Sequence, residues 1–160
     1  MSIKDRSSGK TSLRVVFWGT YDTGKPRVRL LLAGMQTQDV EVIQCHVNVW
    51  KDIEDKHSLS KSWVRLLYQA SRWLFAYPRL IFRYMMLPSH DLVIVTYMGQ
   101  LDVLLLWPFT RLRRVPVVWD VYISLYEAAV TDRGCLAPTS FMARCLYVWE
   151  WLACRAATLM

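Results

Sequence analysis

A short basic turn follows the first apolar run of the chain, and it holds the residue types that bind phosphate. Within FWGTYDTGKPRVRLLL, Gly19 and Gly24 allow backbone N–H groups to approach an anion, and Lys25 and Arg27 carry positive charge. The start of the helix that follows adds a favourable partial charge. The spacing matches neither GxGxxG nor GxxxxGK[ST], so a phosphate-contacting loop and a plain solvated turn both fit these residues.

Alternating strand-like and helix-like segments must position this turn. An apolar run over 15–18 is typical of a strand buried on both faces, and helical spacing of apolar residues begins at Pro26. The further predicted elements are strands over 41–47 and 91–97, a helix over 101–114 that Pro108 interrupts, a strand over 116–122, and a helix from the cap Thr139 to 157. This order predicts an α/β fold, a Rossmann-like, doubly wound parallel sheet. Ligands of such sheets bind beyond the carboxyl ends of the strands, which is where the basic turn lies.

The composition predicts one folded domain with an uneven charge distribution. Apolar residues make up 54% of the chain and charged residues 21%, which excludes a disordered protein. The net charge of +7 comes from residues 1–14 and 61–87, so a continuous basic surface for nucleic acid is not expected. Residues 1–13 are interpreted as a flexible basic tail and 14–160 as the domain. No stretch is typical of a signal peptide or a membrane span, so the chain is expected to be cytosolic or to lie on a membrane surface.

The cysteines form neither a CxxC pair nor a zinc-binding pattern. They are interpreted as buried, reduced thiols, and no metal site is expected. The four are Cys45, Cys135, Cys145 and Cys154.

Four segments, taken in order, resemble the N-terminal half of the family-4 glycosyltransferases. They are RVVFWGTYDTGKPRVRLLLAGM, VEVIQCHV, DLVIVTYMGQLDV and VPVVWDVYISLYEAAVTDRG, and the resemblance covers residues 14–160. These enzymes have the GT-B architecture, in which two Rossmann-like domains face each other across a cleft and the N-terminal one mainly holds the acceptor. The resemblance implies a retaining hexosyltransferase that transfers sugar from a nucleotide sugar, its substrate, to a membrane-associated glycan or glycolipid. No separate cofactor is implied.

The resemblance also implies roles for residues at two strand ends. The first loop of the family lines the cleft near the donor diphosphate, which makes Gly19, Thr20, Gly24 and Lys25 cleft candidates, with Arg27 beside them. The family places an acid or a histidine at the end of the fourth strand. The histidine is absent here, and Asp120 is the acid expected to position or activate the acceptor hydroxyl. A structural role, in which Asp120 orders the following turn, remains open.

Further acceptor contacts are expected at the third strand end and after the fourth strand. The stretch TYMGQLD places Tyr97, Gly99 and Gln100 where an acceptor sugar can rest. Glu127 is a candidate for the same site, with a plain surface charge as the alternative. His46, at the end of the second strand, is interpreted as a histidine at the edge of the core, in preference to a catalyst.

The family continues beyond the segment that this sequence matches. Relatives pass from the equivalent of Ala156 into another strand, a linker and the donor-binding domain, and LACRAATLM is read as a helix turning into that strand. The domain of residues 14–160 is therefore expected to be incomplete, and the 160 residues are expected not to transfer sugar alone. A separate chain carrying the second domain is a candidate partner.

The segment KSWVRLLYQASRWLFAYPRLIFRYMML, residues 61–87, carries basic and aromatic residues at helical spacing and is predicted to form a long helical insertion after the second strand. On a helix its bases fall within an arc of about 40°; they are Lys61, Arg65, Arg72, Arg79 and Arg83. Trp63 and Trp73 are predicted to lie in the membrane interface, and Pro78 is expected to kink or divide the helix. A cationic stripe on an apolar body predicts peripheral binding to an anionic membrane, the inner face of the cytoplasmic membrane by resemblance. A core-packed helix with a solvated basic face, or a groove for single-stranded nucleic acid, are the alternatives.

Two other functions share parts of these features. A non-catalytic α/β module that binds a membrane surface or a partner protein would have the same fold. A nucleotide-dependent oxidoreductase is disfavoured, because GxGxxG and an acid at the ribose-binding spacing are both missing.

Overall fold

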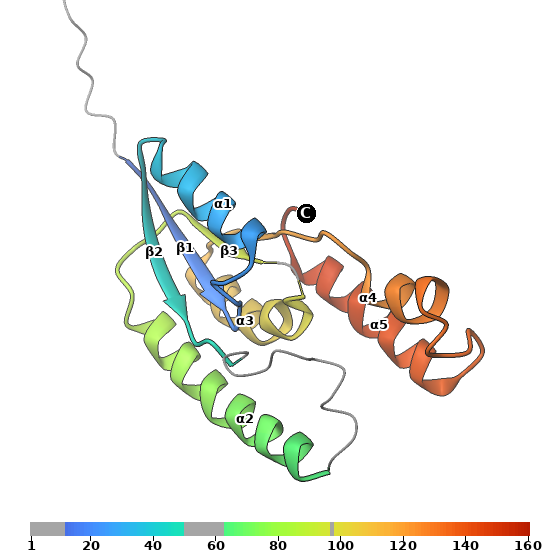
Figure 1. Ribbon diagram of the computed structural model, residues 1–160. Coiled ribbons are helices and arrows are strands. Elements are labelled where there is room, and N and C mark those ends of the chain that lie inside the picture. The colour runs from blue at the N-terminus through green and yellow to red at the C-terminus, as the bar shows by residue number, and fades with distance from the viewer. Residues whose placement is uncertain (1–11, 50–62, 97) are drawn as a thin grey trace, which may run out of the picture.

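The computed structural model describes residues 12–49, 63–96 and 98–160, which form a parallel sheet with helices on both faces (Figure 1). Its strands, in the spatial order β2-β1-β3-β4, are all parallel. They are β1 (Leu13–Gly19), β2 (Val40–His46), β3 (Leu92–Val95) and β4 (Val117–Trp119). The predicted α/β class and parallel sheet are confirmed, and the arrangement is compatible with a Rossmann-like fold.

In the described part of the chain, five α-helices connect and follow these strands. They are α1 (Pro26–Gln36), α2 (Trp63–Met85), α3 (Gln100–Arg113), α4 (Leu125–Glu127) and α5 (Phe141–Ala156). A π-helical turn, η2 (Ala128–Asp132), continues α4. The predicted long helical insertion after the second strand is confirmed, because α2 lies between β2 and β3. The predicted tail falls on residues 1–13; residues 1–11 lie outside the described residues, and Leu13 begins β1.

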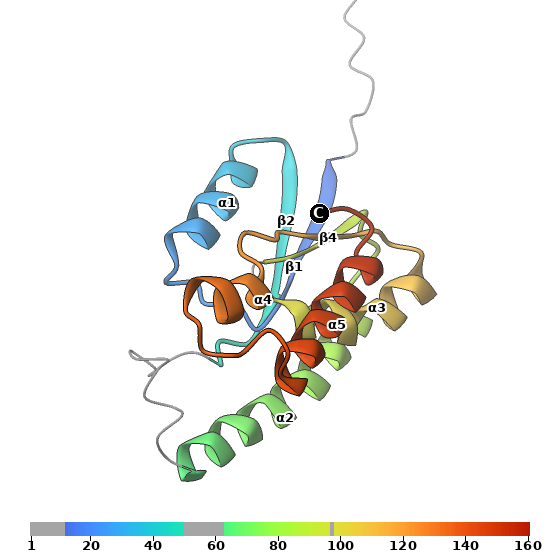
Figure 2. The ribbon, with the colours of Figure 1, turned by 90° about the vertical axis from the view of Figure 1, so that its right-hand side faces the viewer.

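The sheet has a hydrophobic core on each face, as the strict alternation of side chains in β1 requires. Val16 and Trp18 face the helices α2, α3 and α5, and Val15 and Phe17 face α1. Figure 2 shows the strands between α1 on one side and the pair α3 and α5 on the other. All four of these β1 side chains are buried, which confirms the strand predicted to be covered on both faces.

The helices on opposite faces create a switch point between β1 and β3. These two strands are neighbours, yet α1 after β1 and α3 after β3 lie on opposite sides of the sheet. The register aligns Trp18 with Val95 and Val95 with Trp119. The loops after β1, β3 and β4 therefore leave the same edge of the sheet, and a crevice opens where the helices diverge.

Helix α2 runs through Pro78 without being divided, which corrects one part of the prediction. Ala76, Leu80 and Tyr84, which lie before and after Pro78, are all buried against the core. Pro78 itself is exposed, so its ring lies on the outer side of the helix. Packing on both sides of the proline holds the helix together despite the missing backbone hydrogen bond. Pro108 likewise lies inside α3 and does not interrupt it.

Local hydrogen bonds explain two further differences at element ends. Strand β4 stops at Trp119, before the predicted end at 122, because the N–H of Val121 turns back to the carbonyl of Trp119 (2.9 Å). Helix α5 is capped by Ser140, not Thr139: the Ser140 hydroxyl accepts the N–H of Ala143 at 3.1 Å. Beyond α5, Leu159 forms a parallel bridge with Val118. That bridge confirms the turn into a strand that was read from LACRAATLM.

The cysteines are all free, as expected, but only part of their predicted burial is confirmed. Cys45 is buried in the core and Cys154 is half-buried, whereas Cys135 and Cys145 are exposed. Cys135 follows η2, and Cys145 lies on an exposed side of α5.

Candidate functional site

An open groove of about 700 Å³ lies where the start of α1 meets the end of β4. We call it the Arg27–Asp120 groove; its lining is Lys25, Pro26, Arg27, Leu30, Leu31, Asp120, Tyr122 and Ile123. Pro26 opens α1, so its fixed φ suits the first helical position and places Arg27 in the first turn. The predicted phosphate-binding bases and the predicted catalytic acid thus line one cavity.

Arg27 and Asp120 form a two-pronged ion pair across the groove, although 93 positions separate them in the chain. Nε of Arg27 donates to Oδ2 of Asp120 at 2.9 Å, and Nη2 donates to Oδ1. The guanidinium also lies over the Tyr122 ring, 4.7 Å from its centre. The hydrogen bonds from Arg27 to Asp120 raise the pKa of the guanidinium. With a side chain only 16% exposed, Asp120 is the better sheltered member of the pair.

The basic turn places the N-terminus of α1 at this groove. The Asp22 side chain accepts the N–H of Gly24 at 2.9 Å, which closes a tight turn before the helix. Lys25 is the N-cap residue; it makes no side-chain cap, and the first turn of α1 holds no acid. The uncapped N–H groups and the base at Lys25 therefore give this end of the groove a positive character.

The other predicted loop residues, Gly19, Thr20 and Gln100, lie apart from the groove, at the switch point between β1 and β3. There the buried carboxylate of Asp102 holds the first loop. It accepts the backbone N–H of Thr20 at 2.8 Å, the Thr20 hydroxyl at 3.1 Å and the Tyr77 hydroxyl at 2.9 Å. Burial raises the pKa of Asp102, and these hydrogen bonds oppose the rise only in part.

The sequence reading missed Asp102, although a signal was present. Asp102, Leu106 and Thr110 recur at intervals of four and are all buried, so a carboxylate stands on the core face of α3. A buried charge needs partners, and these are Thr20 from the loop after β1 and Tyr77 from α2.

The glycines at the switch point serve close packing. Gly19 has φ +132°, and an added Cβ would lie about 3.0 Å from Cγ of Asp102 and nearer still to its oxygen. At Gly99 an added Cβ would lie 2.6 Å from the carbonyl oxygen of Thr96. The structure therefore gives both glycines a structural reason that needs no bound anion.

Glu127 lies away from both the groove and the switch point. Its side chain is exposed on α4, which fits the alternative of a surface charge. Glu150 of α5 was missed and has the larger structural role. It accepts the Ser124 hydroxyl at 2.7 Å and the N–H of Leu125 at 2.9 Å, and so fixes the start of α4. This contact joins residues 25 positions apart.

His46 fits its interpretation as a histidine at the edge of the core. It is half-buried and stacks on Tyr21 with ring centres 4.7 Å apart. Burial, with a smaller effect from the charge of Arg83, lowers its pKa. Within residues 12–49, 63–96 and 98–160, no three His, Cys, Asp or Glu side chains converge as metal ligands would.

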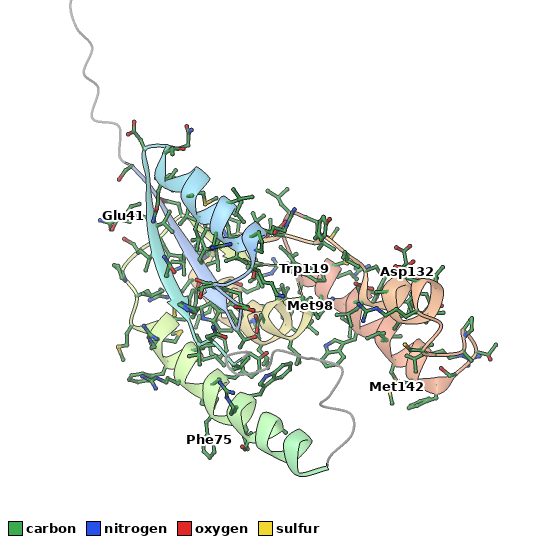
Figure 3. All side chains as sticks on the ribbon, in the orientation of Figure 1. Glu41, Phe75, Met98, Trp119, Asp132 and Met142 are labelled. Atoms are coloured by element: carbon green, nitrogen blue, oxygen red, sulfur yellow. The ribbon has the colours of Figure 1, made fainter. Side chains whose placement is uncertain are left out.

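Helix α2 presents an exposed apolar side next to two exposed arginines. Phe75 is 75% exposed and Phe82 63%, and Figure 3 shows Phe75 on the side of α2 away from the sheet. Arg79 and Arg83 are exposed, whereas Arg72 is half-buried and donates to the carbonyl of Asn48 at 3.3 Å. Among the described helices, none is both long and apolar enough to cross a membrane.

Other residues predicted for the membrane and acceptor sites are placed differently or fall outside the description. Trp73 is half-buried and lines a cavity at the switch point, whereas the sequence predicts it in the membrane interface. Lys61 and Tyr97 lie outside the described residues, as do the side chains of Trp63 and Arg65. The described part of the basic stripe is therefore Arg72, Arg79 and Arg83.

Comparisons with protein-family models, with curated proteins and with solved structures found no match to this chain.

Proposed function

We propose that this chain is the acceptor-binding half of a retaining glycosyltransferase with the GT-B architecture. The proposal rests on the resemblance of residues 14–160 and is supported by a parallel α/β sheet with a long helical insertion after β2. In this proposal the donor-binding domain lies outside these 160 residues, and the nucleotide sugar meets the acceptor above the carboxyl edge of the sheet. The acceptor is a glycan or glycolipid held at a membrane.

The Arg27–Asp120 ion pair is the observation that carries the proposal. A carboxylate offers about four acceptor positions, and Arg27 occupies one on each oxygen. The remaining lone pairs of Asp120 are available to hydroxyl groups of an acceptor in the groove. Arg27 fixes the plane of the carboxylate through its two hydrogen bonds, which is what positioning or deprotonating a hydroxyl requires.

The charge of the groove also fits the other reactant. Lys25 and the uncapped start of α1 favour an anion. In the proposed reaction, the acceptor oxygen attacks the anomeric carbon on the face that the diphosphate leaves. Lys25 stands near the departing diphosphate, whose other charge-stabilising groups belong to the second domain.

The acceptor site can be tested by titrating the 15N-labelled 160-residue chain with the methyl α-glycosides of glucose, mannose and galactose. We expect at least one to shift the backbone amides of Lys25, Arg27 and Tyr122. Asp120→Asn should weaken that binding about tenfold, since a charged acceptor is lost. Asp132→Asn, on the exposed turn η2 (Figure 3), is the matched control and should bind like the wild type.

Two results would contradict the proposal. One is the absence of groove shifts with all three glycosides; the other is an Asp120→Asn variant that binds as tightly as the wild type. Transfer of sugar from UDP- or GDP-hexoses by the 160 residues alone would contradict the placement of the donor site in another domain.

Membrane binding through α2 is a second candidate function, either alone or together with acceptor binding. It is favoured by the exposed apolar side of α2: Leu74, Phe75, Phe82, Met85 and Met86. The adjacent Arg79 and Arg83 match the charge of anionic lipid headgroups. A helix with these two neighbouring sides can lie in the headgroup layer with its phenyl rings buried below the arginines.

Vesicle co-sedimentation tests this candidate. We expect the chain to bind phosphatidylcholine vesicles containing phosphatidylglycerol and to bind pure phosphatidylcholine far less. Phe75→Ser with Phe82→Ser should reduce the binding at least tenfold, and Arg79→Gln with Arg83→Gln about fivefold per charge. The control pair, Phe141→Ser with Leu112→Ser, changes residues that are 81% and 75% exposed on α5 and α3. Equal losses in the control pair would show that the effect does not belong to α2.

A further inference from the structure

A second cavity, of about 250 Å³, lies at the switch point between β1 and β3, and the proposed function does not use it. We call it the Gln100 pocket. It is formed by the loop after β1, the start of α3, and the inner sides of α2, α4 and α5. Its lining includes Thr20, Trp73, Tyr77, Met98, Gln100 and Trp149.

One polar group of this pocket lacks a partner. The Gln100 side chain is buried (8% exposed), and its Nε2 has no hydrogen-bond partner among the described residues. An amide donor buried in this way is unfavourable unless something else accepts its hydrogen bond. The remaining lining is mostly apolar surface. Nε2 exposes almost no surface in the empty cavity, so a rotation of the Gln100 amide must bring it to the acceptor oxygen of a bound molecule.

The other oxygen-bearing side chains around the pocket are already engaged. The hydroxyls of Thr20 and Tyr77 donate to Asp102, and the Glu150 carboxylate accepts from Ser124, Leu125 and Tyr126. These groups leave little capacity for a ligand with many hydroxyls. The pocket is therefore matched to a mostly apolar ligand and not to a free sugar.

The volume of the pocket and the chemistry of its lining limit further which ligands fit. An apolar cavity of about 150 Å³ suffices for benzene, so this pocket has room for a ring with a short substituent. The rings of Trp73 and Tyr77 meet edge to face, with centres 6.2 Å apart, and Trp149 adds a third aromatic wall. Such walls favour another ring through edge-to-face or offset contacts.

The rim of the pocket carries backbone strain of the kind found at ligand sites. Met98 has φ +59°, in the left-handed region that non-glycine residues rarely adopt. Its side chain is 44% exposed and lines the pocket next to the start of α3 (Figure 3).

We infer that the Gln100 pocket binds a neutral, ring-sized apolar molecule, aromatic or alicyclic, through one acceptor oxygen that receives the hydrogen bond of Gln100 Nε2. This inference is independent of the acceptor groove. Acetophenone carries a ring and one carbonyl oxygen. Ethylbenzene has nearly the same shape and lacks the oxygen, so the two probes separate the hydrogen bond from the apolar contact.

The test is an NMR titration of the 15N-labelled 160-residue chain with each probe, following the Gln100 side-chain NH₂ and the amides of Gln100 and Leu101. We expect acetophenone to bind about tenfold more tightly than ethylbenzene, as one hydrogen bond in a dry pocket predicts. Gln100→Leu should abolish that preference, while the same change at the exposed Gln36 of α1 keeps it. Leu146→Phe, which fills the pocket, should block both probes, whereas Leu112→Phe on the outer side of α3 should block neither.

Three results would overturn the inference. They are equal affinity of the wild type for the two probes, a preference that survives Gln100→Leu, and shifts that map away from α3 and the loop after β1. The glycoside titration of the groove reads out different amides, so either proposal can fail while the other stands.

Discussion

The two cavities at the carboxyl edge of the sheet differ in the chemistry of their linings: one is charged and open, and the other is mostly apolar. The Arg27–Asp120 groove is wide, open and lined by charges that remain in contact with water. The Gln100 pocket has about a third of that volume, and its lining is mostly apolar. Gln100 in its wall is buried, and so is Asp102, the carboxylate that holds the wall residues Thr20 and Tyr77. The same sheet edge thus offers one surface that depends on charge and another that depends on packing. Substitutions at the two should differ in size and in their response to salt and pH.

The largest difference is expected between two glycines of one loop. Gly19→Ala forces a side chain into a left-handed φ and against Asp102, so we expect the free energy of unfolding to fall by about 3 kcal/mol or more. In Gly24→Ala, on the groove side, the added Cβ meets only the end of the Asp22 side chain, at 3.1 Å. This substitution should change the free energy of unfolding by less than about 1 kcal/mol. Urea unfolding of both variants measures this. Equal effects would mean that the pocket side is no more tightly packed than the groove.

The buried carboxylate should make stability depend on pH. Burial raises the pKa of Asp102 in the folded chain, so between the unfolded and folded values the folded chain binds the extra proton. Stability relative to Asp102→Asn should therefore fall as the pH rises through that window, by up to about 1.4 kcal/mol per pH unit.

A second variant sharpens the pH experiment. Tyr77→Phe removes a hydrogen bond that favours the ionised carboxylate, so the window should extend to higher pH. Urea unfolding across the pH range gives all three curves. A difference between wild type and Asp102→Asn that does not change with pH would show that Asp102 ionises as easily in the folded chain as in the unfolded one.

Replacing Gln100, whose side-chain amide has an unpartnered N–H group, by an apolar residue should stabilise the ligand-free protein. Gln100→Leu removes a buried amide without a partner, and we expect the free energy of unfolding to rise by about 1 kcal/mol. Gln36→Leu, the same change at an exposed position, should stay within about 0.5 kcal/mol. Thermal and urea unfolding both report the change. A destabilised Gln100→Leu would mean that the amide makes a favourable contact in the free chain.

The smallest effect on stability is expected in the groove. Arg27→Gln removes an ion pair whose arginine is exposed, and such pairs contribute little because water and salt screen them. We expect a small loss at low ionic strength that shrinks further in 1 M salt. Unfolding curves at the two salt concentrations test this. A large loss in the free energy of unfolding that does not depend on salt would show that the pair behaves as a buried ion pair.

The sequence was sufficient for elements whose pattern is local. The apolar run of β1, the helical spacing after Pro26 and the small and apolar residues of α5 each identify an element without knowledge of its neighbours. Where prediction and structure differ, a contact from elsewhere decides. Pro78 does not divide α2 because residues before and after it along the helix are buried against the core. Strand β4 ends early because the N–H of Val121 bonds to the carbonyl of Trp119.

The candidate site shows the same limit. That Arg27 and Asp120 meet follows from strand order, which alternation alone does not determine. Asp102 and Glu150 were missed because their roles consist of hydrogen bonds to partners 25 to 82 positions away. Trp73 was placed on the outer flank of α2, and only the packed structure shows that it faces inward. Residue types therefore predicted which strand ends matter, and tertiary contacts decided which side chains face a cavity.

The hydrogen bonds from Tyr77 and Thr20 to Asp102 have a mechanical consequence. They connect α2 to the first loop of the sheet through a single buried carboxylate. If a surface bound α2 more tightly in one position than in another, the hydrogen bonds through Asp102 would transmit that change of position to Thr20, which lines the Gln100 pocket. By reciprocity, a molecule in the pocket would change the affinity of α2 for that surface by the same factor. The fold thus connects α2 to the first loop of the sheet through one buried side chain.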